Sequence, residues 1–441
     1  MSSGNSFVAF VDAVGELDST PGVLVWKTSS ARLIFSEYTI AVGFPKAGVE
    51  QRRLVSSKRE YVALFVFIAM LSFTLSFIVS SSRAANRDFI DYWASSQLLD
   101  KGANPYDVTA VTLLARSEGY VHQEAPVLYI PPFALPLIMP LGVLTARMAN
   151  GLWIFLMVSC IVMSVHVIRM INGNPENRIH LLGYTFAPIL ICLAAGQIVA
   201  FMLIGLVLFL LLYKSRPFTA GIALSVCAIK PHLLLPFGVA MLLWTIHRKQ
   251  ARIMLGMVTG ILVACAVALV VRPTVWGDYF TAIRGAHLDN IFMPTPSALL
   301  RLAIHPSWPW LQLVPAALAC LWAAWYYLQH RSEWEWAGYE GYLLLLVSLF
   351  VAPRCWTTDE VLAVPALLAL FYLGRHRVAL GCLAAASVVA TGELFFQVQL
   401  NSALYVWTTT AWLACYLWAA EPKSRCADNP LPASAVYGEA R

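Results

Sequence analysis

Two aspartates and a tyrosine in one short segment are the first residues whose types and spacing could do chemistry. In Arg87-Asp88-Phe89-Ile90-Asp91-Tyr92-Trp93, helical spacing would place Asp88, Asp91 and Tyr92 on one face. A carboxylate there could act as a general base if its neighbours keep it ionised near neutral pH. The structural alternative is that Asp88 caps a helix and Asp91 is solvated. Spacing alone leaves both interpretations open.

A lysine and a histidine flank a proline between two apolar segments, 218–229 and 233–246. An ionisable side chain in apolar surroundings is costly, which makes Lys230 a candidate for a functional role. Lysine offers a compact positive charge, and phosphate is the ligand that suits it. His232 lies at the same interruption. The alternative is that Lys230 extends its amine to the membrane surface.

A second basic and acidic pair lies in Arg354-Cys355-Trp356-Thr357-Thr358-Asp359. Arg354 could hold a phosphate through its planar guanidinium group, and Asp359 could contact sugar hydroxyls. An ion pair at the membrane surface is the alternative. Three further side chains could bind a sugar by stacking or hydrogen bonding, although the two aromatic ones could equally anchor the chain at the interface: Tyr129, Trp356 and Gln197.

Membrane helices must position these residues. The chain of 441 residues is 59% hydrophobic and only 12% charged, whereas a soluble domain is about 25% charged. Its apolar residues form blocks suited to crossing about 30 Å of hydrocarbon as helices. Because backbone groups in lipid must be paired within a segment, the blocks predict an all-α polytopic membrane protein. We expect about 12 transmembrane helices.

Basic clusters between the apolar blocks predict the orientation of the chain. One cluster precedes the first expected span, 61–80, and places the N-terminus in the cytoplasm. Residues 1–57 are then a cytoplasmic lead, 58–420 the transmembrane catalytic domain and 421–441 a cytoplasmic tail. With this topology every candidate residue falls on the outer face. A polar set on one side of the membrane indicates a site that opens outward.

Several classes of function have no visible site in the sequence. There is no P-loop, no GxGxxG after a strand and no HExxH motif. The positive charge lies in clusters between apolar blocks, which is a topology signal and does not predict a nucleic-acid partner. The nine cysteines show no CxxC and no Cys/His spacing. No metal site and no cofactor are therefore firmly predicted; a divalent metal is compatible with the sequence, but no motif supports one.

The order of the motifs resembles the family-87 glycosyltransferases of the GT-C class, whose best-known members are polyprenyl-phosphate-mannose-dependent mannosyltransferases. The resemblance covers about residues 60–420. It rests on Asp88-Phe89-x-x-Tyr92, Gly102-x-Asn104-Pro105-Tyr106-Asp107, Tyr129-x-Pro131-Pro132-Phe133-Ala134-Leu135, Leu152-Trp153, Gly196-Gln197, Lys230-Pro231 and Trp356-x-x-Asp359. In the family a histidine often precedes the last aspartate, whereas Thr358 precedes it here. This departure would be consistent with a different sugar or acceptor.

The resemblance implies inverting transfer of a sugar, with mannose the best-known one and arabinose an alternative. The donor would be a polyprenyl-phosphate sugar, and the acceptor a lipid, a polysaccharide or a protein. Asp88 would be the general base, facing outward from a bacterial plasma membrane. Lys230, His232 and Arg354 would stabilise the leaving phosphate. The other expected substrate-binding residues are Asp91, Tyr92, Asn104, Tyr106, Tyr129, Gln197, Trp356 and Asp359.

Two other functions compete with sugar transfer. A secondary transporter would also have many spans, broken helices and intramembrane charge. However, no internal repeat relates the two halves of the sequence, and a transporter site should lie near the midplane of the membrane. A non-catalytic scaffold in the cell envelope would leave the clustered polar groups unexplained. We therefore expect a transferase, with the transporter as the alternative.

Overall fold

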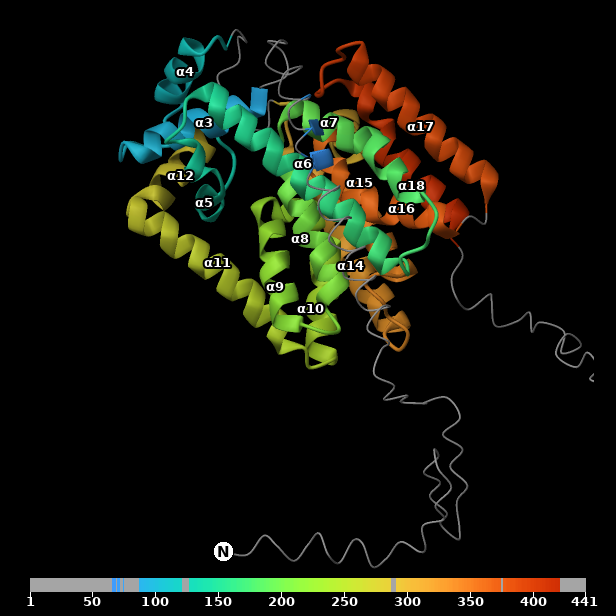
Figure 1. The fold of residues 1–441 in the computed structure, drawn as a ribbon. Helices are drawn as coiled ribbons and strands as arrows, with labels where there is room; N and C mark the ends of the chain where they lie inside the picture. The colour runs from blue at the N-terminus through green and yellow to red at the C-terminus, as the bar shows by residue number, and fades with distance from the viewer. Residues whose placement is uncertain are drawn as a thin grey trace, which may run out of the picture. The chain divides into compact units, whose positions relative to one another are not determined.

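Helices are the regular elements of this chain, as its apolar blocks predict. The computed structural model describes residues 66–68, 70–71, 74, 87–120, 127–286, 291–373 and 376–420. All of them belong to one unit, Phe65–Arg441. Within these ranges the chain forms α-helices and 3-10 helices (labelled η) and no strand, so the predicted all-helical fold is confirmed (Figure 1). Most of the expected first span, the lead 1–57 and the tail 421–441 lie outside the described residues.

Four helical stretches in the described ranges are long and apolar enough to cross a membrane. They are α6 (Ala146–Ile171), α11 (Ala251–Val271), η7 (Pro309–Leu313) continued by α14 (Val314–His330), and α17 (Arg377–Phe395). A broken pair, Pro217–Ile229 and Pro231–His247, forms a fifth candidate, with its halves inclined by 117°. The expected interruption at Lys230 is therefore present, whereas a count of about 12 spans is not confirmed.

Prolines explain why two apolar stretches of the chain are fragmented. A proline removes a backbone donor and clashes with the preceding turn. The proline-rich stretch after Tyr129 forms three short pieces: η1 (Pro132–Ala134), α5 (Leu135–Ile138) and η2 (Met139–Leu141). The apolar stretch 181–195 is divided between η3 (Ile179–Thr185) and α7 (Ala187–Ala195), because Phe186 is extended and Pro188 lies in the first turn of a new helix.

The remaining elements are shorter helices. Several connect the longer ones, and some of them carry the residues of the candidate site. They are α3 (Arg87–Asp100), α4 (Val108–Ser117), α8 (Val199–Leu212), α9 (Pro217–Ser225), η4 (Val226–Ile229), η5 (Pro231–Leu234), α10 (Leu235–His247), α12 (Val275–Gly285), α13 (Pro296–Ile304), α15 (Tyr339–Val351), η8 (Thr357–Ala363), α16 (Val364–Leu373), η9 (Ala403–Tyr405) and α18 (Trp407–Ala419).

Close helix packing supports the segment that ends at Lys230. Helix α9 packs along α11, where Gly221 faces the carbonyl of Ile253 and Gly256 faces that of Phe218. A Cβ atom at either glycine would overlap the backbone of the other helix. Small residues of this kind let two helix backbones approach closely. The segment η8 packs on α7, α8 and α18, which brings the C-terminal part of the chain to the turn after α7.

Candidate active site

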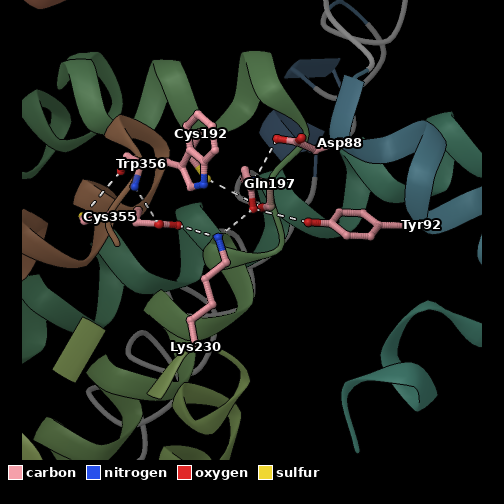
Figure 2. A network of polar contacts seen from close by, with 8 residues as sticks. Asp88, Tyr92, Cys192, Gln197, Lys230, Cys355 and Trp356 are labelled. Carbon is pink, nitrogen blue, oxygen red and sulfur yellow. Dashed lines mark hydrogen bonds and ion pairs between the residues drawn. The ribbon is translucent and has the colours of Figure 1, made fainter. Parts of the chain in front are cut away.

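A hydrogen-bonded network centred on Gln197 joins four segments that are distant in the sequence (Figure 2). The Gln197 Nε2 atom donates to Asp88 Oδ2 over 2.8 Å. Its Oε1 atom accepts from Tyr92 Oη over 3.3 Å and from Lys230 Nζ over 3.2 Å. Asp88 and Tyr92 come from α3, Gln197 from the turn between α7 and α8, and Lys230 from the break before η5. One carboxamide therefore bridges an acidic and a basic group.

The turn that carries Gln197 depends on glycine at position 196. Gly196 ends α7 with φ +71°, in the left-handed region. A Cβ atom there would lie 3.2 Å from the Cβ atom of Phe89 on α3. The indole Nε1 of Trp153 donates to the Gly196 carbonyl over 2.8 Å. Glycine thus allows both the turn geometry and the close approach of α3, which brings Asp88 to Gln197.

Lys230 forms a second connection, to Asp359. Its Nζ atom lies 2.7 Å from Asp359 Oδ1, and the two side chains are 15% and 1% exposed. Lys230 has φ −130° and ψ 72°, outside the helical region, because it lies between η4 and Pro231. An ammonium group has three N–H donors. Asp359 and Gln197 accept from two of them, and the part of the chain that the structure describes shows no acceptor for the third.

Asp359 is fixed within η8 by the preceding turn. Its Oδ2 atom accepts from the backbone N–H of Trp356 over 3.0 Å, and its own N–H donates to the Trp356 carbonyl over 2.8 Å. Asp359 is thus a buried partner of Lys230, and Trp356 is linked to the network through its backbone. The sequence predicted both positions as substrate contacts, but it did not predict that they hold one another.

His232 and Arg354 complete a basic side of the network. The ring of His232 hydrogen-bonds the backbone of Arg354 and interacts electrostatically with Lys230 and Asp359. Two cationic side chains, Lys230 and Arg354, and the imidazole of His232 thus lie in one neighbourhood, where they could bind an anion. Tyr92 stays a neutral donor, because its burial, followed by the charges of Asp88 and Asp91, raises its pKa well above the usual value.

Other expected site residues lie in the loop and segments near α3. The Oδ1 atom of Asn104 accepts from the backbone N–H of Tyr106 over 2.9 Å, and Tyr106 Oη donates to the carbonyl of Ile130 over 3.0 Å. Asn104 and Tyr106 therefore shape a turn and connect it to the segment after Tyr129. Tyr129 is 40% exposed. Asp91 lies on α3 near Asp88 and acts electrostatically on Tyr92.

Metal binding has no visible basis in the described ranges. Within them, no three histidine, cysteine, aspartate or glutamate side chains are grouped closely enough to hold an ion. What the network offers is a carboxylate, an ammonium and a neutral amide between them. Such an arrangement can accept a proton at one end and stabilise a growing negative charge at the other.

Comparison with known families decides the class of the protein. The family model for glycosyltransferase family 87 matches residues 127–391. The chain belongs to this family. A comparison with curated proteins and one with solved structures gave no match.

The family-87 match covers three of the four segments that meet in the network. Gln197, Lys230 and Asp359 lie inside residues 127–391, whereas Asp88 and Tyr92 precede them. The glycosyltransferase must bind a sugar donor and an acceptor, and its apolar helices indicate a membrane protein. The network is the candidate site for that activity.

Sequence reasoning missed two residues that support this glycosyltransferase site. In the sequence Trp153 is only part of a motif, whereas in the structure its indole N–H donates to the Gly196 carbonyl. Glu360 follows Asp359 and is 2% exposed, with both carboxyl oxygens in hydrogen bonds to α18. The only signal for Glu360 is an acidic residue at the start of an apolar run, and its partners lie 48 and 52 residues later.

Proposed function

We propose that this glycosyltransferase moves a sugar from a polyprenyl-phosphate donor to an acceptor hydroxyl, with inversion at the anomeric carbon. The supporting observation is that Gln197 bridges Asp88 and Lys230, over 2.8 Å and 3.2 Å. Transfer from a phosphate donor needs a base for the acceptor hydroxyl and a cation for the leaving group. Asp88 is the proposed base and Lys230 the proposed cation.

The reaction can be written with these groups in place. Asp88 removes the proton from the acceptor hydroxyl as its oxygen attacks the anomeric carbon. A bond forms between these two atoms, and the bond from the anomeric carbon to the phosphate oxygen breaks. The electron pair leaves with the phosphate, whose charge becomes more negative by one unit. Attack from the side opposite the leaving phosphate inverts the configuration, and Asp88 keeps the proton until product release.

The orientation of Gln197 supports an ionised Asp88. An ammonium group can only donate, so the Gln197 atom facing Lys230 must be the carboxamide oxygen. The Nε2 group is then directed to Asp88 and needs an acceptor, which an ionised carboxylate provides. A base must be unprotonated before reaction, and Gln197 favours that state.

The basic side of the network suits a leaving phosphate. Lys230 is proposed to direct its third N–H to a phosphate oxygen while keeping its bonds to Gln197 and Asp359. His232 and Arg354 are proposed as further phosphate ligands. Such groups stabilise negative charge most where it grows in the transition state. Tyr92, Asp91, Tyr129 and Trp356 remain the proposed contacts to the sugar and the acceptor.

The proposed setting is a bacterial plasma membrane, with the site open to the outer face, both termini in the cytoplasm and a GT-C type of architecture. The basic clusters between apolar blocks support this orientation. Mannose is the proposed sugar, and the acceptor is proposed to be a lipid-linked or polysaccharide hydroxyl. The polyprenyl tail would lie against the apolar helices.

Label transfer tests this proposal. Purified protein in detergent is incubated with radiolabelled polyprenyl-phosphate mannose and a membrane lipid extract, and labelled products are separated by chromatography. Wild type should transfer label, and Asp88→Asn should lower the rate by about 100-fold or more, since a general base contributes on that order. The matched control is Asp100→Asn, an exposed aspartate at the other end of α3.

Two outcomes would contradict parts of the proposal. Equal transfer by wild type and Asp88→Asn would remove Asp88 from the role of base while leaving the donor class intact. No transfer by folded wild type, with other polyprenyl-phosphate sugars also tried, would exclude the proposed donor class.

A further inference from the structure

Glu360 is a buried acidic residue that the proposed reaction does not use. It directly follows Asp359 in η8 and is 2% exposed. Its Oε1 atom lies 2.6 Å from Thr408 Oγ1, and its Oε2 atom accepts from Trp412 Nε1 over 2.6 Å. Both partners come from α18, which packs on η8. The carboxyl group therefore fastens η8 to α18 next to the residue that holds Lys230.

Hydrogen positions around Thr408 depend on the charge of Glu360. The Thr408 Oγ1 atom lies 2.6 Å from Glu360 Oε1 and 2.7 Å from the Tyr405 carbonyl oxygen. A hydroxyl has one hydrogen and can donate it only once. With an ionised Glu360, one of these two oxygen pairs would have no hydrogen between its atoms. With a protonated Glu360, the acid donates to Thr408 and Thr408 donates to Tyr405, so both short contacts are hydrogen bonds.

The surroundings of Glu360 also favour the neutral form. Burial raises the pKa of Glu360 to about 8, with the charges of Asp359 and Glu393 acting in the same direction. The other titratable groups that interact with it are Tyr405 and Cys355. The two charged neighbours are thus acidic, and the two hydrogen-bond partners on α18, Thr408 and Trp412, are neutral. An isolated charge in such a place would carry a large desolvation cost.

We propose that Glu360 is a positioning residue, held as the neutral acid, that clamps η8 to α18 and so fixes Asp359 against Lys230. A neutral clamp binds the two elements without a second negative charge beside Asp359. Lys230 then has one anionic partner in η8, and its remaining donor is available for a ligand. The link to activity rests on the proposed function, whereas the charge state of Glu360 does not.

Infrared spectroscopy tests the charge state without an activity assay. The difference spectrum between wild type and Glu360→Gln, recorded near neutral pH in a detergent without ester groups, should contain the carbonyl band of a protonated carboxylic acid. That band should fade as the pH is raised through about 8. A difference spectrum that shows a carboxylate band at neutral pH instead would overturn the proposal.

Folding and transfer assays test the positioning role. Glutamine reproduces the shape of the neutral acid and can donate to Thr408 while accepting from Trp412. Glu360→Gln should therefore fold and keep a transfer rate within about threefold of that of wild type. A threefold change in rate corresponds to less free energy than a shift of one pKa unit. Misfolding of Glu360→Gln, or a loss of about 100-fold with folding intact, would contradict a neutral clamp.

A matched pair at position 408 separates the clamp from general packing. Thr408→Val removes the hydroxyl but keeps the shape, and it should lower transfer and shift the infrared band of Glu360. Thr408→Ser keeps the hydroxyl and should leave the band in place. If Thr408→Val changes neither the transfer rate nor the infrared band, Thr408 is not the partner of Glu360 and the proposal fails. If wild type shows no transfer at all, the proposed function fails, and the infrared result still decides the state of Glu360.

Discussion

The charged groups of the network are held in pairs and bridged by a neutral one. Gln197 connects Asp88 with Lys230 without adding charge, and Asp359 balances Lys230 from the other side. Because Lys230 and Asp359 are largely withdrawn from water, each depends on the other for compensation. Thermal stability and transfer rate should therefore respond differently when only one residue of the Lys230–Asp359 pair is neutralised and when both are.

Neutralising Lys230 alone should lower both the thermal stability and the transfer rate. Lys230→Met leaves the carboxylate of Asp359 buried without its cation, and loss of one partner of such a pair costs about 3–5 kcal/mol. The double change Lys230→Met with Asp359→Asn should recover much of the thermal stability but not the transfer rate, because the cation is still missing. Thermal unfolding in detergent and label transfer measure the two quantities. Recovery of transfer in the double variant would show that Lys230 acts only in folding.

The turn between α7 and α8 sets how α3 meets the rest of the site. Gly196 combines a left-handed backbone with close contact to Phe89, whereas Gly102 has φ +70° and no atom within 4 Å of an added Cβ. Alanine costs about 1–2 kcal/mol in that conformation at either position. Alanine therefore has the same backbone cost at both glycines, but only at position 196 would its Cβ atom also crowd a neighbouring residue.

Gly196→Ala should thus lower thermal stability more than Gly102→Ala. It should also slow transfer, because α3 carries Asp88 and is displaced by the new Cβ. Thermal unfolding and label transfer of the two variants, compared side by side, give the result. Equal effects of both substitutions would show that the approach of Phe89 to Gly196 has no part in the site.

Sequence reasoning located the elements of the site better than it located their contacts. Pro231 next to Lys230 and Gly196 next to Gln197 are local signals, and the structure places a break and a turn there. Whole spans were less predictable, because apolar content does not reveal where residues 181–195 divide into η3 and α7. The pairing of Lys230 with Asp359 joins residues 129 positions apart, and no local pattern encodes it.

Glu360 shows another reason why prediction was incomplete. A single acidic residue before an apolar run is typical of the edge of a membrane segment. Its buried state becomes visible only when Thr408 and Trp412 are brought to it by the packing of α18. The role of such a residue depends on tertiary contacts and not on spacing.

The stability of the whole protein should depend on pH through the protonation of Glu360. The pKa of Glu360 is raised from 4.5 to about 8 in the folded protein. Its contribution to stability is therefore fully present below about pH 4.5 and is lost as the pH rises through about 8. Residue 360 cannot titrate in Glu360→Gln. The melting temperature of this variant should therefore rise relative to that of wild type as the pH increases from about 5 to about 8. A difference that does not change with pH would indicate that Glu360 has the same pKa folded and unfolded.

Orientation of the whole chain in the membrane can be tested with single cysteines. Ser117 at the end of α4 and Ser332 after α14 are both exposed. The predicted topology puts residues near Ser117 outside and residues near Ser332 inside. In a background with Cys382→Ser and Cys426→Ser, a membrane-impermeant thiol reagent should label Ser117→Cys in intact cells and Ser332→Cys only after permeabilisation. The reverse pattern would overturn the outward-facing site.

The spacing of the network along the chain sets the order in which the site is assembled during synthesis. Asp88 is made 109 residues before Gln197, and Lys230 is made 129 residues before Asp359. A nascent chain thus contains the ammonium of Lys230 long before its buried counter-ion exists, and a chain that stops before η8 never acquires it. The site becomes complete only when synthesis has passed Asp359, in the last third of the polypeptide, so that termination before this residue leaves an incomplete site.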